Sequence, residues 1–441
     1  MADEAITAEE EGGSGPDLLI EMLSSEGGTI DTVDLRPSTF TSSGIRNVML
    51  PLLTNLSARV LYLPIDRLDL VCSKTIAMMM KNNIGPPIEE LHLSNLSSDE
   101  QIEPELSRKV SSMIISSLRH NTNIKKLHII PEAPLHQSVP SSIASILYDN
   151  NVLSSLILRG CGISHSGATK ISCALASNAS ITVLDLSNNP LGNGGVCSVA
   201  LALELNHTIQ KLKLSGTNMS REGGEAMVEA LAVNKSLEVL DMSRNSLDDL
   251  VVTKLSRSLK QNTALRQLSL RSNSFSTIGA LCISLALYDS KNLRALLGCN
   301  HTLTYLNIDS NQLSNECLMH TNNSLRWNAL SSTENESIRK KVSSFLLESE
   351  SNCLCFRDYF EDANTVLQLM PNVLWSMNQN ATVLYYLVKN LTVPHITTGG
   401  DELAVTKSFD SVFSKDNICN TGAKDDNICA IPEFVTVNSN D

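Results

Sequence analysis

The sequence has few aromatic residues, fewer basic than acidic residues, and no long apolar run. Phe, Trp and Tyr make up 4% of the 441 residues, which leaves few rings to stack on bases. The 34 basic and 47 acidic residues give a formal net charge of −13, opposite to that of most nucleic-acid-binding or membrane-surface proteins. No apolar stretch reaches the roughly 18 residues that a membrane span needs. We therefore expect neither nucleic acid nor a membrane as a partner.

Signals for export, for zinc sites and for a disulfide framework are also missing. The first residues, MADEAITAEEEGGSGPD, are acidic and carry no apolar segment, unlike a secretory signal. The 11 cysteines are scattered and odd in number, and they include no CxxC pair. These features predict a cytoplasmic protein with reduced thiols, and a nuclear location is the alternative.

A repeated segment organises most of the chain. Copies that fit the pattern L-x-x-L-x-L-x-x-N/C-x-L recur at a spacing of about 28 residues, and weaker copies precede them at less regular spacing. Because the apolar positions alternate, each copy predicts a short strand followed by a turn. The clear copies begin at Leu153, Ile181, Ile209, Leu237, Leu265 and Leu303, and the weaker ones at Ile30, Ala58, Ile88 and Ile124.

A second pattern in the same register predicts a helix in each repeat. A Leu-x-x-Asn motif, such as Leu203 to Asn206, ends three residues before the next repeat begins, and only the repeat at Ile88 lacks it. Val196 and Val199 upstream of it have helical spacing. We expect each asparagine to end its helix by adopting left-handed backbone geometry. One repeat is therefore a strand, a turn and a helix, and neighbouring repeats must stack to bury their apolar faces.

A 28-residue α/β unit with this strand motif resembles the ribonuclease-inhibitor-like class of leucine-rich repeats. The resemblance covers residues 30–325. It implies an α/β solenoid in the form of a horseshoe, with parallel strands on the concave face and helices on the convex face. The class also includes the sensor ends of innate-immune receptors and GTPase-activating proteins of the Ran type.

The flanking segments differ from the repeats in composition. We expect residues 1–29 to be a disordered acidic tail, 30–325 a solenoid of about ten repeats, 326–395 a C-terminal helical cap, and 396–441 a flexible tail. A separate helical module that binds a partner is the alternative for the cap. The insertion near 291–299 is either a loop or an extended helix.

The ninth position of the clear repeats carries Asn, Cys or Thr. These residues lie where the chain turns out of each strand, so their side chains can satisfy backbone groups of a neighbouring turn. The period therefore indicates a structural ladder and not a catalytic set. Its members are Cys161, Asn189, Thr217, Asn245, Asn273 and Asn311.

Side chains that alternate with the buried leucines point out of the concave face and are the candidates for partner binding. His92 and His128 would be neighbours on adjacent strands, but no third ligand is evident, so we expect solvated histidines, no metal and no cofactor. Asp185, Lys213 and Asp241 would form a charge ladder that either solubilises the sheet or selects a partner. The candidates are Tyr62, His92, His128, Arg159, Asp185, Lys213, Asp241, Arg271, Tyr305 and Asp309, and further outward positions hold Arg36, Glu90 and Lys126.

The sequence carries no recognisable set of catalytic residues. We therefore expect a non-enzymatic, monomeric scaffold that binds a partner protein on the concave face. The resemblance leaves two alternatives: a GTPase-activating regulator of the Ran type, and a binder akin to ribonuclease inhibitor or to immune sensors.

Overall fold

The computed structural model describes residues 15–25, 30–37, 39–94, 104–131, 139–291 and 293–351. The chain divides into two compact units, Met1–Lys341 and Val342–Asp441. All ten strands lie in the first unit. None of the helices within the described ranges is long and apolar enough to cross a membrane.

The strands form one parallel sheet in which neighbours in space are neighbours in sequence. Each strand begins two residues after the start of a predicted repeat, which confirms an α/β leucine-rich-repeat solenoid. The strands are β1 (Thr32–Asp34), β2 (Val60–Pro64), β3 (Glu90–Ser94), β4 (Lys126–Ile130), β5 (Ser155–Ile157), β6 (Val183–Asp185), β7 (Lys211–Lys213), β8 (Val239–Asp241), β9 (Gln267–Ser269) and β10 (Tyr305–Asn307).

The repeat leucines are in register across the sheet and form the core. Leu184 pairs with Leu212, and Leu212 pairs with Leu240. Each of these side chains is at most 1% exposed, because alternate residues of a strand point to the same face. The same register holds in the irregular early repeats, where Leu61 pairs with Leu91 and Leu91 with Leu127.

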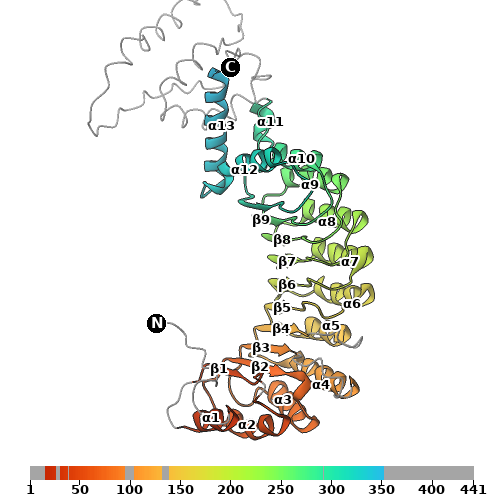
Figure 1. The fold of residues 1–441 in the computed structure, drawn as a ribbon, viewed down its shortest axis with the longest axis vertical. Helices are drawn as coiled ribbons and strands as arrows, with labels where there is room; N and C mark the ends of the chain where they lie inside the picture. The colour runs from red at the N-terminus through yellow and green to blue at the C-terminus, as the bar shows by residue number, and fades with distance from the viewer. Residues whose placement is uncertain are drawn as a thin grey trace, which may run out of the picture. The chain divides into compact units, whose positions relative to one another are not determined.

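Helices cover the face of the sheet to which the leucines point (Figure 1). The opposite face, which carries the side chains that alternate with those leucines from Asp34 on β1 to Asn307 on β10, is called the open face below. The helices between strands are α2 (Ser42–Thr54), α3 (Leu70–Asn82), α4 (Pro104–Ser117), α5 (Val139–Asp149), α6 (His165–Leu175), α7 (Gly192–Leu205), α8 (Arg221–Val233), α9 (Asp249–Gln261), α10 (Thr277–Leu287) and α11 (Leu293–Leu297), with short 3₁₀ segments at Ile65–Arg67 and Leu118–His120.

The asparagines that end the helices act through hydrogen bonds and not through left-handed backbone geometry. Asn206 has an extended backbone, with φ −85° and ψ 129°. Its Oδ1 accepts from the N–H groups of Thr208 and Ile209, both at 2.9 Å. Its Nδ2 donates to the carbonyls of Leu175 and Asn178, both at 2.8 Å. The expected left-handed geometry was therefore wrong: the Asn206 amide instead ties its repeat to the previous one.

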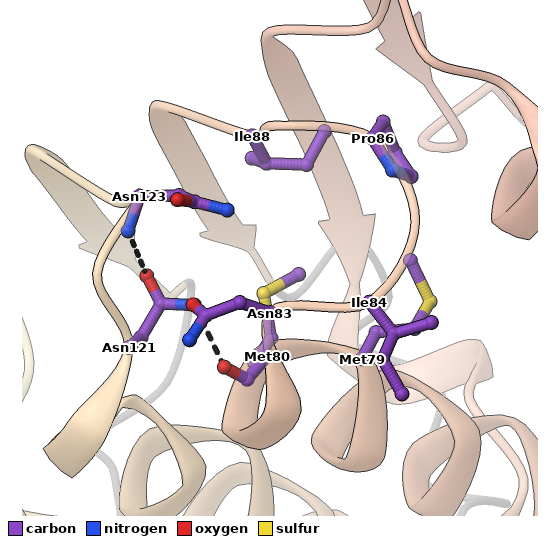
Figure 2. A pocket seen from close by; sticks show the side chains of 8 residues that line it. All are labelled: Met79, Met80, Asn83, Ile84, Pro86, Ile88, Asn121 and Asn123. Atoms are coloured by element: carbon purple, nitrogen blue, oxygen red, sulfur yellow. Dashed lines mark hydrogen bonds between the residues drawn. The ribbon is translucent and has the colours of Figure 1, made fainter.

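The series of helix-ending asparagines has a gap just before the repeat that begins at Ile88. Gly85, with φ +90°, occupies the place of the asparagine. Asn121 of the following repeat instead donates to the carbonyl of Met80 at 2.7 Å. A small hollow of about 10 Å³ lies between this turn and Asn121, with room for about one water molecule. Figure 2 shows the residues that line it: Met79, Met80, Asn83, Ile84, Pro86, Ile88, Asn121 and Asn123.

The ends of the first unit differ in part from the expectation. Helix α1 (Gly15–Ser24) lies within the segment predicted to be a disordered tail, because Leu23 and the neighbouring Leu19 and Ile20 pack against the core. The insertion contains a separate short helix, α11. Two further helices, α12 (Asn315–Ala329) and α13 (Glu334–Ser351), follow β10. The rest of the expected cap, to residue 395, and the expected tail 396–441 lie outside the described residues.

Candidate functional site

A row of stacked side chains crosses the first four strands on the open face. The guanidinium of Arg36 lies 4.0 Å from the centre of the Tyr62 ring. The Tyr62 and His92 rings are stacked with centroids 4.1 Å apart, and the His92 and His128 rings meet edge to face at 4.2 Å. The register explains the row, because Tyr62 pairs with His92 and His92 with His128. We call these four residues the aromatic row.

Acidic residues hold the aromatic row at both ends. Arg36 donates two side-chain hydrogen bonds to the Asp34 carboxylate, at 2.9 and 2.6 Å. Glu90 precedes His92 by two residues on β3, so their side chains leave the same face. Its Oε1 lies 2.8 Å from His92 Nε2 and 3.8 Å from His128 Nε2, and its Oε2 accepts from Lys126 Nζ at 2.8 Å.

The sequence prediction of two solvated histidines without a third ligand was therefore wrong in its geometry. The side chains of His92 and His128 are 16% and 17% exposed, and Glu90 supplies a third ligand atom beside them. The sequence places Glu90 at an outward position on the strand of His92. Whether its carboxylate reaches the two histidines depends on side-chain rotamers, which the sequence does not specify.

Burial sets the protonation state of the two imidazoles. It lowers the pKa of His92 despite the hydrogen bond to Glu90, and it lowers the pKa of His128, with a further lowering from His92. Burial opposes the ionised form of Glu90, but hydrogen bonds from Lys126 and His92 outweigh it and lower the pKa of Glu90. At neutral pH the cluster holds neutral imidazoles beside a carboxylate.

The predicted charge ladder is partly structural. Lys213 is exposed and its Nζ lies 3.8 Å from Asp185, but Asp185 itself is 6% exposed. The Oδ1 atoms of Asp185 and Asp241 accept from the backbone N–H groups of Ser187 and Ser243, both at 2.9 Å. These carboxylates therefore hold the turn after each strand, and only part of their charge is offered to a partner.

The remaining predicted residues lie farther along the sheet and do not join the aromatic row. Arg159, Arg271 and Asp309 are exposed just after β5, β9 and β10, and Tyr305 on β10 is 51% exposed. Ile157 on β5 follows His128 in register, so the aromatic row ends at β4. The open face therefore carries one packed cluster over β1–β4 and a more scattered polar surface beyond it.

The ninth-position residues lie in the turns after the strands. Asn189 Nδ2 donates to the carbonyl of Leu158 at 2.7 Å, one repeat earlier, and its Oδ1 accepts from the N–H of Ile163. Asn245, Asn273 and Asn311 repeat the donation to a carbonyl of the preceding repeat. Thr217 donates to the carbonyl of Leu214, and the Cys161 thiol donates to that of Ile129. These side chains bond to backbone groups of the turns, which agrees with a structural role.

Comparison with known proteins agrees with the repeats. A family model of leucine-rich repeats matches residues 177–200, 205–228 and 299–319. These matches lie within the ten-stranded sheet and its helices and agree with a leucine-rich-repeat fold. No curated protein matches the sequence.

Several solved structures are similar to this chain at low identity. The leucine-rich-repeat protein LegL7 from Legionella pneumophila is 14% identical, with 68% of this chain and 98% of that one covered and a TM-score of 0.39. An internalin from Listeria monocytogenes is 17% identical over 64% of this chain and 67% of its own, with a TM-score of 0.34. The tropomodulin C-terminal domain from Caenorhabditis elegans is 16% identical over 43% and 92%, with a TM-score of 0.28.

Proposed function

We propose that this chain is a scaffold that binds a partner protein over the open face of its sheet, with the aromatic row as the main anchor. The observation that carries the proposal is the aromatic row itself. Arg and Tyr are enriched among the residues that dominate protein interfaces, where they lie in packed and largely desolvated clusters. Asp34 and His92 hold Arg36 and Tyr62 in place, and the Arg36 side chain, 39% exposed, keeps surface that a partner could bury.

The size of the open face supports a protein partner. Ten strands about 4.8 Å apart span roughly 43 Å, enough for an interface of about 800 Å² on each partner. In contrast, the hollow lined by Met80 and Asn121 has room for about one water molecule and is too small for an organic ligand. Beyond the aromatic row, Lys213 and Arg271 are exposed on the face and would select a partner by charge. We expect the chain to act as a monomer.

A pair of tyrosine substitutions tests the proposal. Tyr62 lies on the open face, whereas Tyr148 lies 58% exposed on helix α5 and serves as the matched control. Tagged full-length wild type, Tyr62→Ala and Tyr148→Ala are purified from cells of the source organism, and the co-purified proteins are quantified by mass spectrometry. We expect Tyr62→Ala to lose at least one partner about tenfold, as truncation of an anchor residue does, while Tyr148→Ala retains it.

Melting curves of the three proteins keep this test interpretable. Because Tyr62 is half-buried between Arg36 and His92, its truncation must leave the cooperative unfolding transition intact before a lost partner counts. Lys213→Glu is a second open-face variant that removes no packed ring. Recovery of the same proteins with all variants would overturn the proposed binding surface.

A further inference from the structure

Two histidines of the aromatic row and the adjacent Glu90 are groups that metal ions use as ligands. Glu90 and His92 extend from β3, and His128 extends from the adjacent β4 (Figure 1 places the two strands side by side). One ligand atom from each of the three residues lies within 4.8 Å of the other two. All three side chains are partly buried on a sheet whose backbone positions are fixed by pairing.

The separations are close to those of a tetrahedral zinc site. Zinc bonds of about 2.0 to 2.1 Å place two tetrahedral ligand atoms roughly 3.3 Å apart. The observed distances from Glu90 Oε1 are 2.8 Å to His92 Nε2 and 3.8 Å to His128 Nε2, on either side of that value. The third separation, between ligand nitrogens of the two histidines, is within 4.8 Å, so a bound ion would have to draw the two rings closer together.

We propose that Glu90, His92 and His128 bind a divalent transition-metal ion such as Zn²⁺ on the open face. Two imidazoles and one carboxylate form a mixed ligand set that suits zinc and related ions better than Mg²⁺ or Ca²⁺, which prefer oxygen ligands. Three protein ligands leave a fourth coordination position for water or for a side chain of a bound partner. The proposal does not depend on partner binding, because it concerns the isolated chain.

The protonation states agree with this ligand set. Burial lowers the pKa of both His92 and His128, so each imidazole is neutral at neutral pH and has one nitrogen with a lone pair, and the pKa of Glu90 is lowered so that it is ionised. His92 Nε2 carries the proton of its hydrogen bond to Glu90, so an ion bound at that atom must displace this proton to the other ring nitrogen.

Lys126 competes with the ion for Glu90. Its Nζ donates to Glu90 Oε2 at 2.8 Å, and its side chain is 55% exposed, so it can move into solvent. The adjacent Lys125 makes the same contact with a different acid, Glu89, at 2.8 Å and 56% exposure. Removal of the Lys126 charge should tighten metal binding, whereas removal of the Lys125 charge, which is not on a ligand, should change it less.

The test is zinc titration of the metal-free, full-length chain by isothermal calorimetry near neutral pH. We expect His92→Gln and His128→Gln each to weaken one Zn²⁺ equivalent by at least about tenfold. His207→Gln removes an exposed histidine far from the cluster in sequence and should leave that equivalent unchanged. Lys126→Gln should bind Zn²⁺ several-fold more tightly than Lys125→Gln, and Mg²⁺ should not compete.

The outcomes separate the site from other zinc ligands and from misfolding. The chain also has 11 cysteines, so zinc binding that survives both histidine substitutions would assign the ion to thiols and overturn the proposal. Absence of any zinc binding by the wild type would overturn it as well, leaving Glu90 only as the hydrogen-bond acceptor of His92. Circular dichroism of every variant shows that the fold is kept, and the gain expected for Lys126→Gln cannot come from unfolding.

Discussion

Single asparagine side chains connect the repeats of this protein. Asn234 is fully buried, and its Nδ2 donates to the carbonyls of Leu203 and Asn206 while its Oδ1 accepts from the N–H groups of Ser236 and Leu237. One amide thus satisfies four backbone groups at the point where a helix ends and the next strand approaches. Buried backbone groups of this kind are costly to leave without partners.

The residue-scale prediction is that Asn234→Ala lowers the free energy of unfolding by about 2 to 4 kcal/mol, because several buried backbone groups lose their only side-chain partner. Lys235→Ala, at the exposed neighbouring residue, should change it by less than about 0.5 kcal/mol. Urea unfolding followed by circular dichroism gives both values. Equal stability of the two variants would contradict a structural role for the helix-ending asparagines.

The asparagine pattern also shows what the sequence can and cannot predict for a residue. The period located the helix-ending asparagines as far as Asn300, because a hydrogen bond that recurs in each repeat requires the same residue at the same place. It missed Asn328, whose Nδ2 donates to the carbonyl of Asn300 at 3.1 Å. The backbone geometry was predicted wrongly, since an asparagine that ends a helix can do so in left-handed or in extended conformation. Asn83, which ends α3 shortly before Ile88, does have left-handed geometry, with φ 52°.

At the scale of elements, the strands were predictable and their side-chain clusters were not. Alternating leucines fixed all ten strands and their register, so Tyr62, His92 and His128 were placed on one face correctly. The position of Glu90 against both histidines depends on rotamers, which a pattern of residue types does not specify. Helix α1 was missed because its acidic, Gly-rich flank masked the apolar residues that pack on the first repeat.

Helix α13 contributes a buried lysine to the end of the repeats. Lys341 Nζ donates to the carbonyls of Leu287 and Asn300 at 2.6 and 2.7 Å, and it lies 3.1 Å from His301 Nδ1. Burial lowers the pKa of Lys341 to about 7, and burial, with the nearby Lys341 charge, lowers the pKa of His301 to about 3. His301 therefore stays neutral near pH 7 while Lys341 titrates.

The element-scale prediction concerns the pH dependence of stability. Between about pH 7 and about pH 10 the unfolded chain keeps the Lys341 proton and the native chain releases it, so the free energy of unfolding rises with pH through this term. Lys341→Met has no ionisable group at this position and therefore lacks this contribution to the pH dependence. Stability measured by urea unfolding at about pH 6 and about pH 9 should therefore increase more for wild type than for Lys341→Met. Parallel changes in the two proteins would show that the Lys341 pKa is not lowered.

At the scale of the first unit, every repeat buries its leucines only by stacking on its neighbours. The outward sides of the paired strands thereby form one continuous face, and the residues on it are free of the packing constraints on the core. This division explains why the fold follows from the sequence period, whereas the partner does not. The leucines repeat in every unit and the asparagines in nearly every one, but within the described ranges the aromatic row occurs once, at β1–β4.

The most direct test of binding through the open face is crosslinking from two positions in adjacent repeats. A photoreactive amino acid is placed at Lys211, exposed on the open face at β7, or at Leu205, 66% exposed at the end of α7. Crosslinking in cells of the source organism should join a partner protein to the Lys211 position and not to the Leu205 position. A partner captured from Leu205 and absent from Lys211 would contradict the account.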